Sequence, residues 1–306
     1  HLDFIPRICK NLKTNAKTSK LKSLKTVKTK RMYMGLKAFI EILRPANCFM
    51  AAIAVFIGYV VAIGKIWFET ELFFAMASAF LICGAGQVIN DFFDVRIDEK
   101  IRPQKILPSK KMKVQTALFY SAALFGTGLI LASQINMPAF LIAFSFTVLL
   151  ALYSAVIQKQ KFLGNIVVAL GTAFTIIFGA SIVQNYNVAI FLATSAFFSN
   201  MGLEITKDVQ DKEADKGHKT TLAMILTQNQ VNIVVLAFYA LAFLTAFFVW
   251  QTKMIQSNYY LLLLIVSGGL FLYSFVLLLQ KQPGKAQLFS KIAMVFSLLA
   301  FISGVF

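Results

Sequence analysis

Apolar runs about as long as one membrane crossing alternate with short polar connections along most of the chain. An α-helix rises about 1.5 Å per residue, so roughly 20 apolar residues cross a hydrocarbon core of about 30 Å. The pattern predicts nine such helices, at residues 45–64, 72–90, 114–133, 138–157, 163–183, 188–206, 230–251, 258–280 and 287–305. We therefore predict an all-α, polytopic membrane protein with about nine transmembrane helices.

The composition agrees with this prediction, because 58% of the residues are hydrophobic and only 14% are charged. A soluble domain usually carries about 25% charged residues. Too few polar side chains are present to cover so much apolar surface in water. The composition therefore excludes a soluble globular enzyme.

The distribution of basic residues predicts the orientation in the membrane. With nine crossings, one side of the membrane holds only Lys65 and Lys253, and the other side holds the remaining 28 of the 30 Lys and Arg residues. Cytoplasmic segments carry such an excess of Lys and Arg. We therefore expect a multi-pass protein of the cell membrane, with its N-terminus on the cytoplasmic side.

The N-terminal segment differs in composition from the rest of the chain. Residues 1–31 contain ten basic residues and one acidic residue, Asp3. We predict a basic cytoplasmic tail over residues 1–35, followed by one transmembrane domain over residues 36–306. A basic tail beside a membrane crossing is expected to contact anionic lipids. Nucleic-acid binding is the alternative, but Phe4 is the only aromatic residue of residues 1–31, so we expect no nucleic-acid partner.

Nine of the 13 acidic residues lie in two short segments. The first acidic window, residues 91–99, and the second acidic window, residues 204–215, each follow an even-numbered predicted crossing. Each contains three aspartates separated by three and four positions, namely Asp91, Asp94 and Asp98, and Asp208, Asp211 and Asp215. Such positions share one face of a helix. The repeat predicts two acidic faces that meet at the cytoplasmic end of a common cavity.

Three carboxylates on one helix face repel one another, and the membrane boundary makes this repulsion more costly. The arrangement becomes favourable when cations bind there. Mg²⁺ prefers oxygen ligands and usually takes one or two carboxylates together with substrate phosphates. The alternative is a pair of solvated, charged helix ends. Because the spacing occurs twice, we favour a Mg²⁺–diphosphate site.

At these residues the chain resembles the UbiA superfamily of intramembrane prenyltransferases. The first motif of that superfamily, N-D-x-x-D-x-x-x-D, is present at residues 90–98, and the second, D-x-x-x-D, at residues 211–215. The resemblance extends from about residue 38 to the end. Residues 204–208, Glu-Ile-Thr-Lys-Asp, are similar to the E-I-x-K-D segment of the archaeal digeranylgeranylglyceryl phosphate synthases. The first loop departs from the family pattern at Lys110, where glycine is common.

The resemblance implies a helical bundle around a central cavity, with Mg²⁺ as cofactor. It also implies transfer of a geranylgeranyl group from geranylgeranyl diphosphate to the glycerol hydroxyl of geranylgeranylglyceryl phosphate. The product is an ether-lipid precursor, and diphosphate is released. The expected partners are these two substrates and the surrounding membrane lipids, and the active site is expected on the cytoplasmic side.

The resemblance assigns roles to particular residues. The residues expected to act in catalysis are Asp91, Asp94, Asp208, Asp211 and Tyr153. The expected metal ligands are Asn90, Asp91, Asp94, Asp98, Asp208, Asp211 and Asp215. The residues expected to bind the polar parts of the substrates are Arg44, Asn47, Gln87, Arg96, Arg102, Lys105, Lys159, Asn165, Glu204, Lys207 and Lys219. Tyr153 would stabilise a carbocation through its ring, or serve only as an interfacial tyrosine. Apolar substrate tails would occupy a cavity lined by runs such as residues 169–182.

Two other functions remain open at this point. A UbiA-type enzyme of quinone biosynthesis would use an aromatic acceptor, which does not need a cation such as Lys207 for an acceptor phosphate. A transporter built from paired repeats is the more distant alternative. A transporter predicts charged groups near the middle of the membrane, whereas the acidic residues here lie at one end of the predicted crossings.

Overall fold

The computed structural model describes residues 35–155, 161–213 and 220–305. A helical segment at residues 35–42 leads into the first crossing. The helices that follow are α2 (Pro45–Ile63), α3 (Thr70–Ile101), α4 (Val114–Ser133), α5 (Met137–Ala155), α6 (Lys161–Ala180), α7 (Asn187–Asp211), α8 (Leu222–Ile225), α9 (Gln228–Gln251), α10 (Asn258–Leu279) and α11 (Pro283–Ser303). The basic tail predicted for residues 1–35 lies outside the described part except for its last residue.

Nine of the described helices, all except the short α8 and the segment at residues 35–42, are long and apolar enough to cross a membrane. The predicted all-α membrane architecture is therefore confirmed. The predicted ninth crossing began at residue 287, but α11 begins four residues earlier, at Pro283. The N–H group of the first helical residue has no partner within the helix. Proline, which lacks this group, is therefore favoured at that position.

Two helices extend well beyond their predicted crossings. The second crossing was predicted to end at residue 90, but α3 continues to Ile101. The sixth was predicted to end at residue 206, but α7 continues to Asp211. The extension of α3 contains the whole first acidic window, and the extension of α7 contains Asp208 and Asp211 of the second. These five aspartates therefore lie on helices that continue beyond the apolar part of the bundle.

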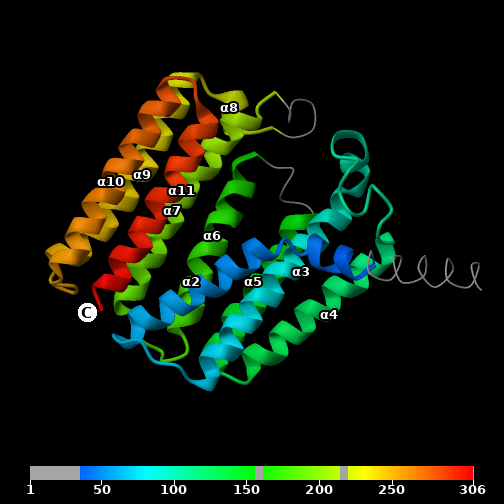
Figure 1. The fold of residues 1–306 in the computed structure, drawn as a ribbon, viewed down its shortest axis with the longest axis horizontal. Helices are drawn as coiled ribbons and strands as arrows, with labels where there is room; N and C mark the ends of the chain where they lie inside the picture. The colour runs from blue at the N-terminus through cyan, green and yellow to red at the C-terminus, as the bar shows by residue number, and fades with distance from the viewer. Residues whose placement is uncertain (1–34, 156–160, 214–219, 306) are drawn as a thin grey trace, which may run out of the picture.

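The bundle consists of two groups of helices joined by a central pair (Figure 1). Helices α3, α4 and α5 pack together in one group, and α7, α9, α10 and α11 form the other. Helices α2 and α6 lie between the groups and pack against each other. They approach very closely, since a Cβ atom added at Gly58 or Gly179 would collide with backbone of the opposite helix. Small residues commonly permit such contacts in membranes.

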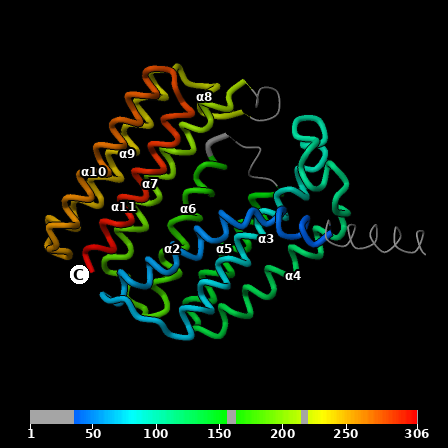
Figure 2. Tube along the Cα trace, viewed as in Figure 1, coloured from blue at the N-terminus to red at the C-terminus, as the bar shows by residue number. Residues whose placement is uncertain are grey.

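Both helices that carry acidic residues end at the same end of the bundle. In Figure 1, α3 and α7 rise toward the upper end of the molecule, where α8 follows α7. Figure 2 shows that the loop after α3, residues 102–113, also lies at this end. The bundle therefore places at one end two segments that are separated by more than a hundred positions in the sequence.

Candidate active site at the shared end of α3 and α7

The first acidic window contains a buried cluster of ion pairs. Asp91 is 5% exposed and accepts hydrogen bonds from the Arg44 guanidinium at 2.6 Å and from Lys105 Nζ at 3.1 Å. The same Lys105 ammonium donates to Asp98 at 2.6 Å, and Asp98 is also 5% exposed. Buried carboxylates require such partners because burial strongly disfavours an isolated charge. Protein cations thus already neutralise part of this window.

Arg44 is positioned by an unusual turn at the start of α2. It is the residue immediately before the helix and has φ 51° and ψ 66°, in the left-handed region that non-glycine residues seldom adopt. Its second guanidinium nitrogen donates to Gln87 Oε1 at 2.7 Å, one turn before Asp91 on α3. Backbone strain of this kind persists only where surrounding contacts maintain it. The two hydrogen bonds to α3 supply such contacts.

Lys105 is positioned by the loop that follows α3. Ile106, Leu107 and Met112 of this loop are buried in a cluster that also includes Val88 of α3. Backbone hydrogen bonds further fix its shape, for example from Ser109 N to Lys105 O at 3.0 Å. The loop is therefore a packed element that directs Lys105 toward α3.

Asn90 and Asp94 form the remaining part of the first window. Asn90 Nδ2 lies 3.3 Å from Asp94 Oδ2, and Asp94 is half-buried. The other amide atom, Asn90 Oδ1, is buried and has no hydrogen-bond partner within the part of the chain that the structure describes. A buried oxygen acceptor without a donor is rare in proteins. It is a suitable ligand atom for a hard cation.

The second acidic window has different partners. Asp208 is 6% exposed and accepts a hydrogen bond from Asn165 Nδ2 of α6 at 2.8 Å. Lys207 pairs with Glu204 one turn earlier, at 3.2 Å, with its side chain nearly half exposed. Asp211 is half-buried and is the last residue of α7. The carboxylates on α7 therefore lie beside both a neutral amide and a lysine.

Tyr153 connects the two windows in space. It lies near the end of α5, and the charges of Glu204, Asp94 and Asp208 all act on its hydroxyl group. These three carboxylates come from both α3 and α7. Since the interaction of two charges weakens with distance, Tyr153 lies nearer to these carboxylates than to the other acidic residues of the described chain.

The predicted metal ligands do not form a ready-made cluster. Across residues 35–155, 161–213 and 220–305, no three Asp, Glu, His or Cys side chains converge into a group that would hold a metal ion. In the first window Arg44 and Lys105 contact two of the predicted ligands, Asp91 and Asp98. Metal binding by these residues remains a prediction.

The other predicted site residues fall into two groups. Arg96, Arg102 and Asn47 are exposed at the acidic end of the bundle, where Asn47 lies in the first turn of α2. Lys159, Asp215 and Lys219 lie outside the described residues. Their assigned roles therefore remain predictions.

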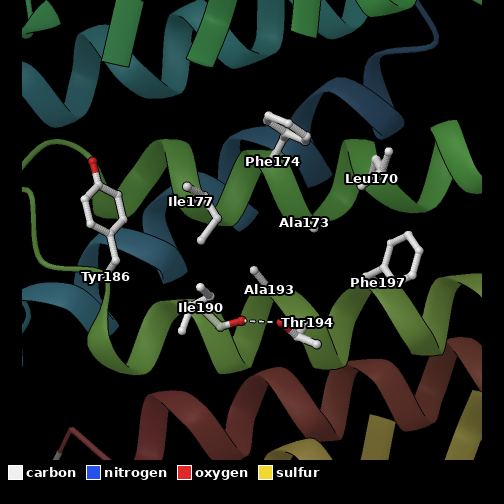
Figure 3. A pocket seen from close by; sticks show the side chains of 9 residues that line it. All are labelled: Leu170, Ala173, Phe174, Ile177, Tyr186, Ile190, Ala193, Thr194 and Phe197. Atoms are coloured by element: carbon white, nitrogen blue, oxygen red, sulfur yellow. Dashed lines mark hydrogen bonds between the residues drawn. The ribbon is translucent and has the colours of Figure 1, made fainter. Parts of the chain in front are cut away.

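A cavity of about 390 Å³ lies between α6 and α7. It is lined by Leu170, Ala173, Phe174, Ile177, Tyr186, Ile190, Ala193, Thr194 and Phe197. Figure 3 shows the side chains of the two helices facing each other, with Tyr186 at one end and Leu170 and Phe197 at the other. The α6 lining falls within residues 169–182, the run predicted to line a cavity for apolar tails. The α7 lining was not predicted, because nothing in the sequence indicates which helix faces α6.

A polar pair deeper in the bundle was also not predicted from the sequence. Asn200 Nδ2 of α7 lies 2.5 Å from Thr172 Oγ1 of α6, and Asn200 is 8% exposed. The pair joins the same two helices as the contact between Asn165 and Asp208, but lies two helical turns farther from the acidic end of the bundle. An amide within an otherwise apolar crossing was the available signal, since polar residues there often connect helices.

Comparison with known proteins identifies a family match over most of the chain. The family model of the UbiA prenyltransferases matches residues 51–301. A digeranylgeranylglyceryl phosphate synthase of Thermococcus kodakarensis is 35% identical over 273 residues, which cover 88% of this chain and 98% of the relative. The enzyme of the same name from Methanosarcina barkeri is 31% identical, with 90% and 100% coverage.

Solved structures give a corresponding result. A structure described as a digeranylgeranylglyceryl phosphate synthase in membranes matches with a TM-score of 0.78 and 31% identity, covering 89% of this chain and 98% of the other. A UbiA homologue from Archaeoglobus fulgidus, bound to GPP and Mg²⁺, matches with a TM-score of 0.65 at 18% identity, covering 86% and 99%. The second likeness concerns the fold alone.

Proposed function

The chain belongs to the UbiA prenyltransferase family, and we propose that it transfers a geranylgeranyl group from geranylgeranyl diphosphate to the glycerol hydroxyl of geranylgeranylglyceryl phosphate. The predicted family and the predicted prenyltransferase class are both confirmed. The choice of acceptor is supported by relatives named digeranylgeranylglyceryl phosphate synthase that match nearly their whole length. Family membership also removes the reason to consider a transporter.

The observation that carries the proposal is that α3 and α7, which carry the two acidic windows, end at the same end of the bundle. Asp91, Asp94, Asp208 and Asp211 would supply carboxylate oxygens from both helices, and Asn90 would supply a buried amide oxygen that has no donor among the described residues. Such hard oxygen ligands suit Mg²⁺. When bound, Mg²⁺ would neutralise the charge that develops on the departing diphosphate. Asp98 and Asp215 would support these ligands.

In the proposed reaction, the bond between the donor's first carbon and its diphosphate oxygen breaks, and positive charge develops on the allylic carbon. The ring of Tyr153 would stabilise this charge. The acceptor hydroxyl oxygen then forms the ether bond and releases its proton, so diphosphate and one proton leave. Glu204 would orient that hydroxyl, and Lys207 would bind the acceptor phosphate as a point charge.

The remaining polar residues at this end would hold the headgroups of the two substrates. Arginine binds phosphate through a planar fork and lysine through a single ammonium group. The proposed set comprises Arg44, Asn47, Gln87, Arg96, Arg102, Lys105, Lys159, Asn165 and Lys219. The apolar cavity between α6 and α7 offers room for part of an isoprenoid tail. The excess of basic residues at the acidic end supports a cytoplasmic active site.

The direct test is product analysis with purified protein and radiolabelled geranylgeranyl diphosphate. Reactions contain either geranylgeranylglyceryl phosphate or an aromatic acid as acceptor, each with Mg²⁺ or with EDTA. We expect a labelled ether lipid only with the glycerol phosphate lipid and Mg²⁺. Turnover with the aromatic acid and none with the glycerol phosphate lipid would replace our proposal with the quinone-type reaction.

A further inference from the structure

The ammonium group of Lys105 already occupies a cation position in the first acidic window. Its Nζ atom lies 3.1 Å from Asp91 Oδ1 and 2.6 Å from Asp98 Oδ2, so one positive charge contacts carboxylates two helical turns apart. The lysine side chain is only 19% exposed, and the carboxylate side chains are 7% and 8% exposed. The contact is thus buried, unlike the exposed pair between Lys37 and Glu41.

Lys105 differs from Arg44, the other cation of this cluster, in how easily it can leave. Arg44 lies at the start of α2 and donates separately to Gln87 and Asp91. A planar guanidinium held at two points is firmly oriented. Lys105 places a single ammonium at the end of a flexible four-carbon chain. The loop that carries Lys105 is anchored by Ile106 and Leu107, so its ammonium can move while the backbone stays in place.

We propose that Lys105 acts as an exchangeable internal counter-ion of the first acidic window. Its ammonium holds Asp91 and Asp98 in position without metal, and Mg²⁺ displaces it when the metal enters. The released ammonium then contacts the substrate diphosphate. This inference rests on the proposed function, because it treats the window as the metal site. Lys105 is accordingly a positioning residue before metal binding and a diphosphate contact afterwards.

The proposal predicts effects of opposite sign for two ligands. In Lys105→Met, Mg²⁺ alone no longer competes with the ammonium, so its binding should become tighter. Inorganic diphosphate, added with saturating Mg²⁺, loses a contact and should bind more weakly. Close charge pairs are coupled strongly enough for an expected change of about tenfold in the Mg²⁺ midpoint. A residue with only a structural role would weaken the binding of both ligands.

The first experiment measures thermal unfolding of the full-length protein in detergent at increasing Mg²⁺ concentrations. Wild type, Lys105→Met and the control Lys113→Met are compared, since Lys113 is an exposed residue just before α4. Lys105→Met should melt at a lower temperature without metal and reach half of its stabilisation at about one tenth of the wild-type Mg²⁺ concentration. A midpoint equal to or above that of wild type would overturn the proposal.

The second experiment uses wild-type protein alone, so it does not depend on whether Lys105→Met folds. Exposed amines are labelled with a lysine-reactive acylating reagent and quantified by mass spectrometry. Labelling of Lys105 should rise with Mg²⁺ alone and fall again when diphosphate is added, whereas labelling of Lys113 stays constant. If wild type forms the ether lipid while Mg²⁺ leaves Lys105 labelling unchanged, this inference fails and the proposed function stands. If wild type forms no product, the proposed function fails first.

Discussion

In the first acidic window Asp91 is bound by two protein cations, Arg44 and Lys105, whereas in the second Asp208 accepts a hydrogen bond from the neutral amide of Asn165. The lysine beside Asp208, Lys207, pairs instead with Glu204. Two segments with the same aspartate spacing thus acquire different surroundings. An internal repeat can therefore preserve the positions of acidic residues while the groups that contact them differ.

The contacts of the two acidic windows differ because different helices and loops pack against α3 and α7. In the first half of the chain, the turn before α2 and the loop after α3 both extend over the end of α3. In the second half, α6 packs along α7 and contributes an amide from its second turn. We therefore expect the ion pairs of Arg44 and Lys105 to stabilise the first window and the amide of Asn165 to stabilise the second.

The largest expected effect follows from removing one carboxylate from either window. Asp91→Asn and Asp208→Asn should each lower kcat at least about 100-fold, because each removes stabilisation of the charge on the leaving diphosphate. Glu71→Gln, at the opposite end of α3, is the matched control and should retain activity. Steady-state transfer assays measure all three variants. Near-normal turnover in either aspartate variant would show that the two windows do not act together.

The stability difference between the windows can be measured by removing one partner from each. Arg44→Met leaves Asp91 with only part of its compensation and should lower the unfolding free energy by about 2 kcal/mol. Asn165→Leu removes one hydrogen bond to a carboxylate and should cost about 1 kcal/mol. Lys37→Met breaks an exposed pair and should change little. Denaturant unfolding in detergent gives these values, and equal losses for Arg44→Met and Asn165→Leu would remove the proposed contrast.

Replacing Lys207, a residue of the second window, is expected to have a smaller effect on the kinetics. If it binds the acceptor phosphate, Lys207→Met should raise KM for the acceptor roughly fivefold, as expected for one partly exposed charge contact. kcat and the KM for the donor should change little, since ground-state binding is lost. Kinetics with each substrate varied in turn measure this. Lys285→Met, an exposed lysine near the start of α11, serves as control. A selective rise in donor KM would reassign Lys207 to the diphosphate.

The smallest expected effect concerns the cavity between α6 and α7. Ala193→Phe places a ring in this cavity and should raise KM for a C20 donor about fourfold more than KM for a C10 donor, because excluding one methylene group from an apolar site costs about 0.8 kcal/mol. The measurement is a comparison of the two donors under identical conditions. Ile233→Phe, on the exposed surface of α9, is the control. Equal changes for both donor lengths would exclude the cavity as a tail site.

Much of the fold could be predicted from the sequence, because the length of an apolar run indicates directly whether a helix can cross the membrane. The nine crossings, the acidic end and the separation of Lys65 and Lys253 from the other basic residues all follow from apolar runs and charge. The extension of α3 to Ile101 could not be predicted from hydropathy, since this part of the helix is polar and is held by the loop packed against it.

The identity of the site residues was easier to predict than their contacts. Arg44, Gln87 and Lys105 were expected to bind substrate, but in the structure each contacts another predicted site residue. These contacts depend on a left-handed turn before α2 and on the fold of residues 102–113. Neither feature leaves a periodic signal in the sequence. The contact between Asn200 and Thr172 was missed for a similar reason, since it requires knowing that α6 lies beside α7.

A structure with Mn²⁺ and a non-hydrolysable analogue of geranylgeranyl diphosphate would show whether α3 and α7 bind one diphosphate between them. Anomalous scattering locates Mn²⁺, and electron density locates the diphosphate. We predict that Mn²⁺ and the diphosphate lie together between Asp91 or Asp94 of α3 and Asp208 or Asp211 of α7. A diphosphate held by one helix alone, or bound away from both, would contradict it.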